Sequence, residues 1–155
     1  MSKITLQDSF KEFCKKNKLE INSPQIKIIN LLDRFLNNKE SFLSRLFKRR
    51  KKLCFYLHGK VGVGKTMLLD FVYERSKIKK HRQHFNEFMI GFHDFRHKKK
   101  DKNTINAFVL NLKKKYDLIY LDEFQVTNIV DAMILGKLFE VIFEENIKII
   151  ITSNT

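Results

Sequence analysis

The sequence predicts an α/β fold, in which a parallel β-sheet is flanked by helices and preceded by a helical N-terminal segment. After residue 52, short apolar runs typical of buried strands alternate with longer segments of helical periodicity. A glycine-rich turn follows the first of these runs and opens a helix. The first 50 residues read as helices alone, so we expect an N-terminal helical segment at 1–50 and a core at 51–155.

The N-terminal segment has helical spacing of its apolar residues. Leu6, Phe10 and Phe13 lie three or four positions apart and indicate one helix. Ser23 and Pro24 predict the start of a second helix, with serine as the N-cap and proline at the first helical position.

A third, short helix is predicted around 42–47 and runs into the basic stretch at 48–52. We interpret that stretch as an exposed linker, because short charge runs are usually solvated.

The core segment alternates predicted strands and helices. Strands are predicted at 53–57, 84–89, 118–121 and 149–151, and helices at 66–77, 104–115 and 129–144. The first strand and the last helix are apolar nearly throughout, so we expect the strand to be buried on both faces and the helix to be buried all round. The alternation favours parallel strands.

The composition excludes several classes of protein. A chain of 155 residues suits one domain with a sizeable core, and 43% hydrophobic residues is too apolar for a disordered chain. Cys14 and Cys54 lie far apart and indicate neither a disulfide scaffold nor a zinc site. No stretch suggests a signal peptide or a membrane span, so we expect a cytoplasmic protein.

The net charge of +14 raises the question of nucleic-acid binding. The basic residues are 24 lysines and only 7 arginines, and lysine lacks the bidentate fork with which arginine reads phosphates and bases. We therefore favour a solvated basic surface, with nucleic acid as the less favoured partner.

A glycine-rich motif connects the first predicted strand to the helix at 66–77. It reads Gly59-Lys60-Val61-Gly62-Val63-Gly64-Lys65-Thr66 and fits G-x-x-x-x-G-K-[ST] without deviation. Glycines let the backbone wrap around phosphate groups, which the N–H groups of the loop and the helix N-terminus then bind. We expect Lys65 to neutralise the β- and γ-phosphates and the Thr66 hydroxyl to bind Mg²⁺. The motif predicts a P-loop NTPase whose cofactors are ATP and Mg²⁺.

Two acidic residues, Asp122 and Glu123, follow the predicted strand at 118–121. Asp122 can hold Mg²⁺ through a water molecule, and Glu123 can polarise the water that attacks the γ-phosphate. Acids often end strands, so the pair becomes specific only in combination with the phosphate loop upstream. A small-molecule kinase does not need a base that activates water, and the pair therefore favours an ATPase.

A third polar position, Asn154, follows the strand predicted at 149–151. Its side chain can orient the attacking water near the γ-phosphate. A Ser-Asn pair after a strand is often only a turn, but the two other motifs favour the functional interpretation.

These motifs and their flanking residues resemble the ZapE-type (AFG-like) family of AAA+ ATPases. The resemblance is carried by Tyr56-Leu57-His58-Gly59, by Lys65-Thr66-Met67-Leu68-Leu69-Asp70 and by His84-Phe85-Asn86-Glu87-Phe88-Met89. It is most specific at Asp122-Glu123-Phe124-Gln125-Val126-Thr127 and Asp131-Ala132-Met133-Ile134-Leu135-Gly136. The family comprises bacterial cell-division ATPases and mitochondrial relatives linked to protein quality control. The resemblance therefore implies a protein partner and leaves a homo-oligomer open.

The sequence departs from the family pattern mildly at Asn86 and Asn128, and strongly in length. Members of the family continue past the Ser-Asn pair with a further strand, an arginine finger and a helical small domain, so we expect an AAA+ core truncated after its fourth strand. In the AAA+ strand order the fifth strand pairs with the first, so 53–57 is expected to form an exposed apolar edge. Since an arginine finger contributes about 10³–10⁵ in rate, we expect nucleotide binding to survive better than turnover.

The sequence thus favours an ATPase that converts ATP to ADP and phosphate, and two alternatives stay open. One is a non-catalytic remnant, or half of a split protein, that binds nucleotide or a partner. The other is a nucleic-acid-linked ATPase similar to the helicase loaders, which the basic charge favours and the stretch Phe124–Thr127 disfavours.

Overall fold

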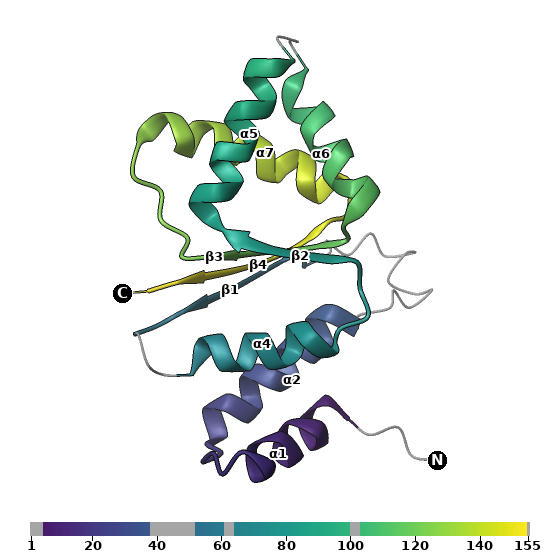
Figure 1. Ribbon diagram of the computed structural model, residues 1–155, viewed down its shortest axis with the longest axis vertical. Coiled ribbons are helices and arrows are strands. Elements are labelled where there is room, and N and C mark those ends of the chain that lie inside the picture. Colours follow the sequence, from purple (N-terminus) through teal and green to yellow (C-terminus); the bar gives the residue numbers. More distant parts are fainter. Residues whose placement is uncertain (1–4, 38–51, 61–63, 100–102, 155) are drawn as a thin grey trace. The chain divides into compact units, whose positions relative to one another are not determined.

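The computed structural model describes residues 5–37, 52–60, 64–99 and 103–154. The chain forms two compact units: Met1–Lys52 with Gly62–Lys77, and Leu53–Val61 with Ile78–Thr155 (Figure 1). The predicted helix at 42–47 and most of the basic run lie outside the described residues. The division expected near residue 50 stays a prediction about domain organisation.

The first unit contains α1 (Leu6–Lys16), α2 (Ser23–Asn37) and α4 (Lys65–Arg75). The side chain of Asn22 accepts a hydrogen bond from the backbone N–H of Gln25 at 2.9 Å, and the Gln25 side chain accepts one from the N–H of Asn22 at 3.2 Å. These reciprocal bonds form a capping box that satisfies the first turn of α2. The prediction that Ser23 is the N-cap is therefore wrong, because the side chain and the backbone N–H of Asn22 make the capping bonds one residue earlier.

Aromatic side chains pack α4 against α1 within this unit. The Phe71 ring lies edge-on to Phe10 with centroids 5.1 Å apart, and its centroid is also 5.1 Å from that of Phe13. The guanidinium of Arg75 lies 3.8 Å from the centre of the Phe71 ring, in a cation–π contact. Phe10 is completely buried, so the apolar spacing seen in the sequence forms the core of this unit.

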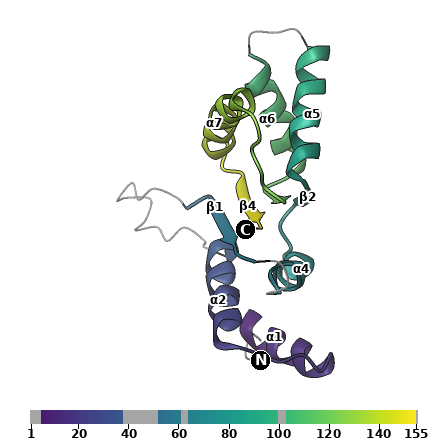
Figure 2. The same ribbon diagram turned by 90° about the vertical axis from the view of Figure 1, so that its left-hand side faces the viewer.

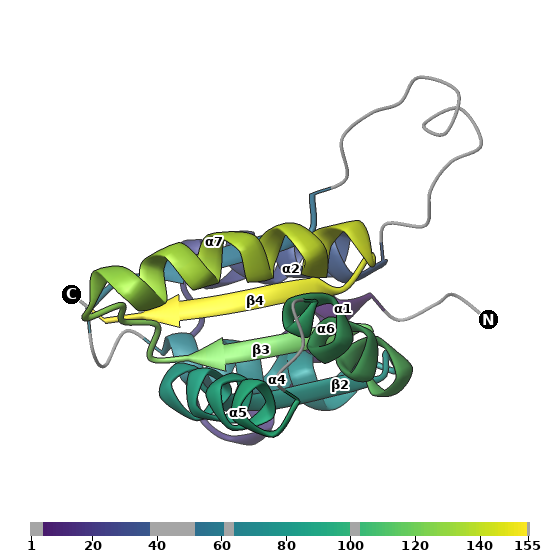
Figure 3. The same ribbon diagram turned by 90° about the horizontal axis from the view of Figure 1, so that it is seen from above.

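The second unit is built on a parallel sheet with the strand order β1-β4-β3-β2. Its strands are β1 (Cys54–His58), β2 (Lys80–His84), β3 (Leu118–Asp122) and β4 (Lys148–Ser153). The helices α5 (Phe85–Lys98), α6 (Thr104–Lys115) and α7 (Ile129–Glu144) lie together on one face of the sheet (Figures 1 and 3). Ile119 and Leu121 of β3 and Ile149 and Ile151 of β4 are buried with these helices. The predicted α/β fold is confirmed.

The second strand lies earlier in the chain than predicted. Residues 84–89 were expected to be extended, but only His84 belongs to β2, and α5 starts at Phe85. Phe85, Phe88 and Phe92 lie at helical spacing and are buried together, and Glu87 accepts a hydrogen bond from the backbone N–H of His84 at 3.4 Å. Because every residue of β2 is polar, hydrophobic periodicity carries no signal for this strand.

β1 is the outermost strand on one side of the described sheet. Phe55 and Leu57 are half-buried, whereas Cys54, Tyr56 and His58 alternate with them and are exposed. The prediction of burial on both faces is wrong, because the face that carries Cys54, Tyr56 and His58 is exposed. β4 is the single strand neighbour of β1 in the described sheet. The expectation that this strand lies at an edge is confirmed.

α7 is apolar nearly all round but is not buried all round. Leu138 and Ile142 are completely buried against the sheet, whereas Ile129, Val130 and Met133 are 77%, 59% and 70% exposed. The prediction of complete burial fails because one layer of helices covers the sheet here, which leaves the outer side of α7 open (Figure 2).

Candidate functional site

The carboxyl ends of β1, β4 and β3 lie side by side at one edge of the sheet. Because the strands are parallel and adjacent, the residues that follow them meet at this edge. Gly59 and Lys60 follow β1, and Asn154 follows β4. Asp122 is the last residue of β3, and Glu123 follows it. The second unit therefore brings together five of the residues that the sequence singled out.

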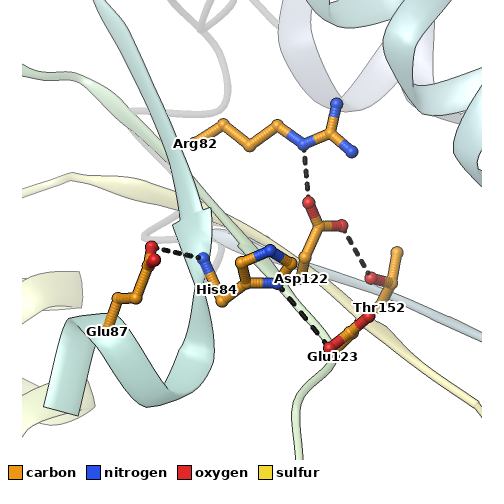
Figure 4. Close-up of polar contacts among 6 residues, drawn as sticks. All are labelled: Arg82, His84, Glu87, Asp122, Glu123 and Thr152. Carbon is orange, nitrogen blue, oxygen red and sulfur yellow. Dashed lines mark hydrogen bonds and ion pairs between the residues drawn. The ribbon is translucent and has the colours of Figure 1, made fainter.

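Two donors hold the carboxylate of Asp122. Arg82 Nε donates to Asp122 Oδ2 at 2.6 Å, and Thr152 Oγ1 donates to Asp122 Oδ1 at 3.1 Å (Figure 4). The side chain of Asp122 is 15% exposed and that of Arg82 is 29% exposed, so the ion pair is screened less than a surface pair. These two hydrogen bonds fix the orientation of the carboxylate at the end of β3.

Tyr120 lies two residues before Asp122, on the same face of β3. The guanidinium carbon of Arg82 lies 4.6 Å from the centre of the Tyr120 ring. Burial raises the pKa of Tyr120, and the neighbouring Asp122 carboxylate raises it further. The phenol therefore stays protonated beside the carboxylate.

Glu123 sits in a strained turn that exposes its carboxylate. Its φ is +54°, a left-handed conformation that costs a non-glycine residue roughly 1–3 kcal/mol. The next residue, Phe124, donates its backbone N–H to the carbonyl of Thr152 at 2.8 Å, which attaches the turn to β4. The side chain is 70% exposed, and its Oε2 lies 3.7 Å from Nδ1 of His84 (Figure 4). The turn thus presents one carboxylate to solvent beside the anchored one.

A hydroxyl cluster links the ends of β4 and β1. Ser153 Oγ lies 2.6 Å from the Tyr56 hydroxyl and 3.0 Å from Nδ1 of His58. His58 directly precedes Gly59, and Ser153 directly precedes Asn154. The cluster therefore fixes the strand ends from which the glycine-rich motif and Asn154 extend.

The rest of the glycine-rich motif leads into the first unit. Val61, Gly62 and Val63 lie outside the described residues. Gly64 has φ +79° ahead of α4, and a Cβ at this position would lie 3.5 Å from Nε2 of Gln25. A glycine is required here by its backbone conformation rather than by lack of space.

The two residues that end the motif open α4. Lys65 is buried and Thr66 is exposed. Both lie in the first turn of α4, where backbone N–H groups have no helical acceptor. They are therefore well placed in the helix for an anionic ligand.

Sequence reasoning missed the side chains that support the acidic pair. Arg82 and Thr152 anchor Asp122, and the cluster around Ser153 joins β1 to β4. The register of the sheet explains the role of Thr152. Leu121 of β3 pairs with Ile151 of β4, so Asp122 and Thr152, which follow them, are neighbours. Nothing in the polar sequence of β2 singles out Arg82.

The fold and these motifs together define a P-loop NTPase of the AAA+ type. AMPPCP-bound DnaA from Aquifex aeolicus is similar in fold, with a TM-score of 0.61 at 20% identity over 100% of this chain and 43% of that chain. The DnaC helicase loader has a TM-score of 0.59 at 16% identity over 87% of this chain and 72% of that chain. At these identities the likeness concerns the fold alone.

The chain belongs to the AFG1-like ATPase family, whose family model matches residues 8–155. Lactation elevated protein 1 homolog B of Danio rerio is 36% identical over 131 residues, which cover 76% of this chain and 26% of the relative. Cell division protein ZapE of Escherichia coli K12 is 35% identical over 101 residues, or 64% of this chain and 27% of the relative. The chain thus spans about a quarter of the length of these curated relatives. Among the described helices, none is long and apolar enough to cross a membrane.

Proposed function

We propose that this chain binds ATP with Mg²⁺ and hydrolyses it to ADP and phosphate. The observation that carries the proposal is the pair of carboxylates after β3, of which Asp122 is anchored by two donors and Glu123 is exposed. The glycine-rich motif starts at the same edge of the sheet, and membership of an ATPase family supports ATP as the nucleotide.

The motif from Gly59 to Thr66 is the proposed phosphate site. Its backbone N–H groups and the N-terminus of α4 suit the phosphate oxygens, and Lys65 balances the charge of the β- and γ-phosphates.

Asp122 and the Thr66 hydroxyl suit Mg²⁺, because this hard cation takes oxygen ligands from one or two protein side chains together with phosphates and water. When bound, Mg²⁺ offsets the negative charge on the phosphate oxygens during hydrolysis. Arg82 supplies the positive partner of Asp122 in the structure described here.

Glu123 is the proposed general base. Its carboxylate accepts a proton from a water molecule as the water oxygen bonds to the γ-phosphorus and the bond from that phosphorus to the β–γ bridging oxygen breaks. The bridging oxygen keeps the electron pair and leaves with ADP. The Asn154 amide suits the task of orienting the water, because it follows β4, the neighbour of β3.

Calorimetry of Mg·ATP binding tests the phosphate site. We expect saturable binding by the parent chain and at least about tenfold weaker binding by Lys65→Ala, because the variant loses a full positive charge from the phosphates. Lys114→Ala, an exposed change near the end of α6, is the matched control and should bind like the parent. Equal binding by parent and Lys65→Ala would contradict the assignment. Binding without phosphate release would favour the non-catalytic alternative.

We infer that the hydrolysis serves a protein partner in the cytoplasm, as in cell division. The support is the likeness to cell division protein ZapE, which concerns 64% of this chain. Co-purification of proteins with the tagged parent chain and with the tagged Glu123→Gln variant tests this role. The variant should keep ATP bound and should therefore retain a partner whose binding requires ATP. Equal recovery of all proteins from both would contradict an ATP-dependent partner.

A further inference from the structure

α7 carries a stripe of apolar side chains beside its buried face. The stripe consists of Val130, Met133, Ile134 and Val141 at helical spacing. Ile134 and Val141 are half-buried and pack against the core, whereas Val130 and Met133 are exposed. Val130 and Met133 are 59% and 70% exposed, among the highest values for apolar residues in the described chain. An exposed row of this kind costs solvation free energy and commonly marks an interaction site.

This stripe forms one wall of a groove between α5, α6 and α7. The groove encloses about 690 Å³, and Phe92 of α5 and Ile105 of α6 contribute to its apolar lining. The three helices lie side by side in the second unit (Figures 1 and 2). A groove formed by helices with an apolar floor suits the apolar face of another helix.

The charged residues of the groove are mostly cationic. Among the described residues of the lining, Arg96 and Lys137 are basic and Glu140 is acidic. Within the described part of the chain, neither Arg96 nor Lys137 forms an ion pair. These two cations without an ion-pair partner favour an acidic partner.

The lining favours a protein segment over single-stranded nucleic acid. Bases bind on exposed aromatic rings, and the one aromatic side chain among the described lining residues, Phe92, is 1% exposed. The exposed part of the floor consists instead of the aliphatic Val130 and the thioether of Met133, whose flexible side chain adapts to apolar groups of a peptide.

We propose that the groove between α5, α6 and α7 binds a short acidic amphipathic helix of a partner protein. Apolar side chains of that helix pack on Val130, Met133 and Ile134, and its carboxylates pair with Arg96 and Lys137. The described residues that line the groove include none of those proposed to bind or hydrolyse ATP, so the proposal does not depend on nucleotide binding.

Selection from a random peptide library tests the proposal. The probe is a displayed library of peptides of roughly 15 residues, about four helical turns, selected on the whole parent chain without nucleotide. We expect enriched peptides with Asp or Glu and apolar residues at helical spacing. Fluorescence anisotropy then compares their affinity for the parent and for variants that retain the parent circular dichroism spectrum.

Matched variants separate the apolar and the charged contributions. Met133→Glu should weaken binding at least about tenfold, and Arg96→Glu several-fold, because a charge replaces a buried contact in one and repels the peptide in the other. Ile90→Glu and Lys114→Glu make the same changes at exposed positions outside the groove and should leave affinity within about twofold. Ile90 is 59% exposed, similar to Val130.

Three results would overturn the proposal. In the first, no peptide is enriched on the parent chain relative to a parallel selection on the Met133→Glu chain. In the second, the enriched peptides are basic or uncharged. In the third, Met133→Glu and Arg96→Glu leave the affinity of the enriched peptides unchanged. Binding of a single-stranded oligonucleotide that Arg96→Glu abolishes and Met133→Glu preserves would identify nucleic acid as the occupant instead.

Discussion

At the scale of single residues, the acidic pair divides two tasks between neighbouring carboxylates. Asp122 is held by Arg82 and Thr152 and is 15% exposed, whereas Glu123 lies in a left-handed turn and is 70% exposed. A carboxylate with fixed orientation suits a metal, and a carboxylate in solvent can exchange a proton with water. The difference follows from their positions, because Asp122 ends β3 beside Arg82 and Thr152, whereas Glu123 lies in the turn that follows the strand.

Because of Tyr120, we expect the folded chain to lose stability at alkaline pH. Burial and the Asp122 carboxylate raise the pKa of Tyr120 above its ordinary value of 10.0. Above pH 10 the unfolded chain loses the phenolic proton while the folded chain keeps it, so the unfolded state binds fewer protons. The free energy of unfolding contributed by this group therefore falls as pH rises, by up to about 1.4 kcal/mol per pH unit.

Urea unfolding between neutral pH and alkaline pH measures this effect. The loss of stability should be steeper for the parent than for Tyr120→Phe, which has no phenolic proton. If the free energy of unfolding fell equally with pH in the parent and in Tyr120→Phe, the pKa of Tyr120 would not be raised in the folded chain.

At the scale of secondary-structure elements, β2 joins the sheet through polar contacts. Its sequence, KHRQH, has no apolar residue, yet all five positions pair with β3. The Arg82 side chain adds an ion pair with Asp122 and lies over the Tyr120 ring. Side-chain electrostatics therefore contribute to a strand position that apolar packing usually provides.

Arg82→Gln tests how much this contact stabilises the edge of the sheet. We expect the free energy of unfolding to fall by about 1–2 kcal/mol, because a partly buried carboxylate loses its charged donor. The matched control is Lys113→Gln, which breaks an ion pair with Asp117 whose side chains are 34% and 46% exposed, and should cost at most about 0.5 kcal/mol. If urea unfolding showed equal losses of stability in the two variants, the ion pair of Arg82 with Asp122 would contribute no more than the exposed pair.

Elements with strong hydrophobic patterning were predictable, and the polar ones were not. The helix at 104–115 and the strand at 118–121 were predicted within one residue, since their apolar positions follow the 3.6-residue period or a continuous run. β2 was misplaced because backbone pairing needs no apolar side chain, and burial in β1 and α7 was overestimated because composition does not reveal which side of an element is covered.

At the site, sequence reasoning identified Asp122, Glu123 and Asn154, which the fold brings to one edge. The supporting Arg82 and Thr152 depend on strand register, which joins residues 40 and 30 positions away from Asp122 in the chain. Such contacts between distant segments are not visible in local patterns.

At the scale of the whole molecule, the proposed roles draw on both compact units. Lys65 and Thr66 belong to the first, and Asp122, Glu123 and Asn154 belong to the second. The strongly basic chain also attracts anionic ligands such as ATP. Because salt screens this attraction, the association rate of ATP with the chain should fall as salt is added.

Phosphate release from ATP by the parent and by Glu123→Gln is the measurement that tests the central claim most directly. We expect release by the parent that requires both Mg²⁺ and ATP, and a loss of roughly 10²–10⁴-fold in Glu123→Gln with ATP affinity unchanged, because the amide cannot accept the proton of water. Glu144→Gln, an exposed change at the end of α7, should turn over ATP like the parent. Turnover by Glu123→Gln at the parent rate would contradict the account.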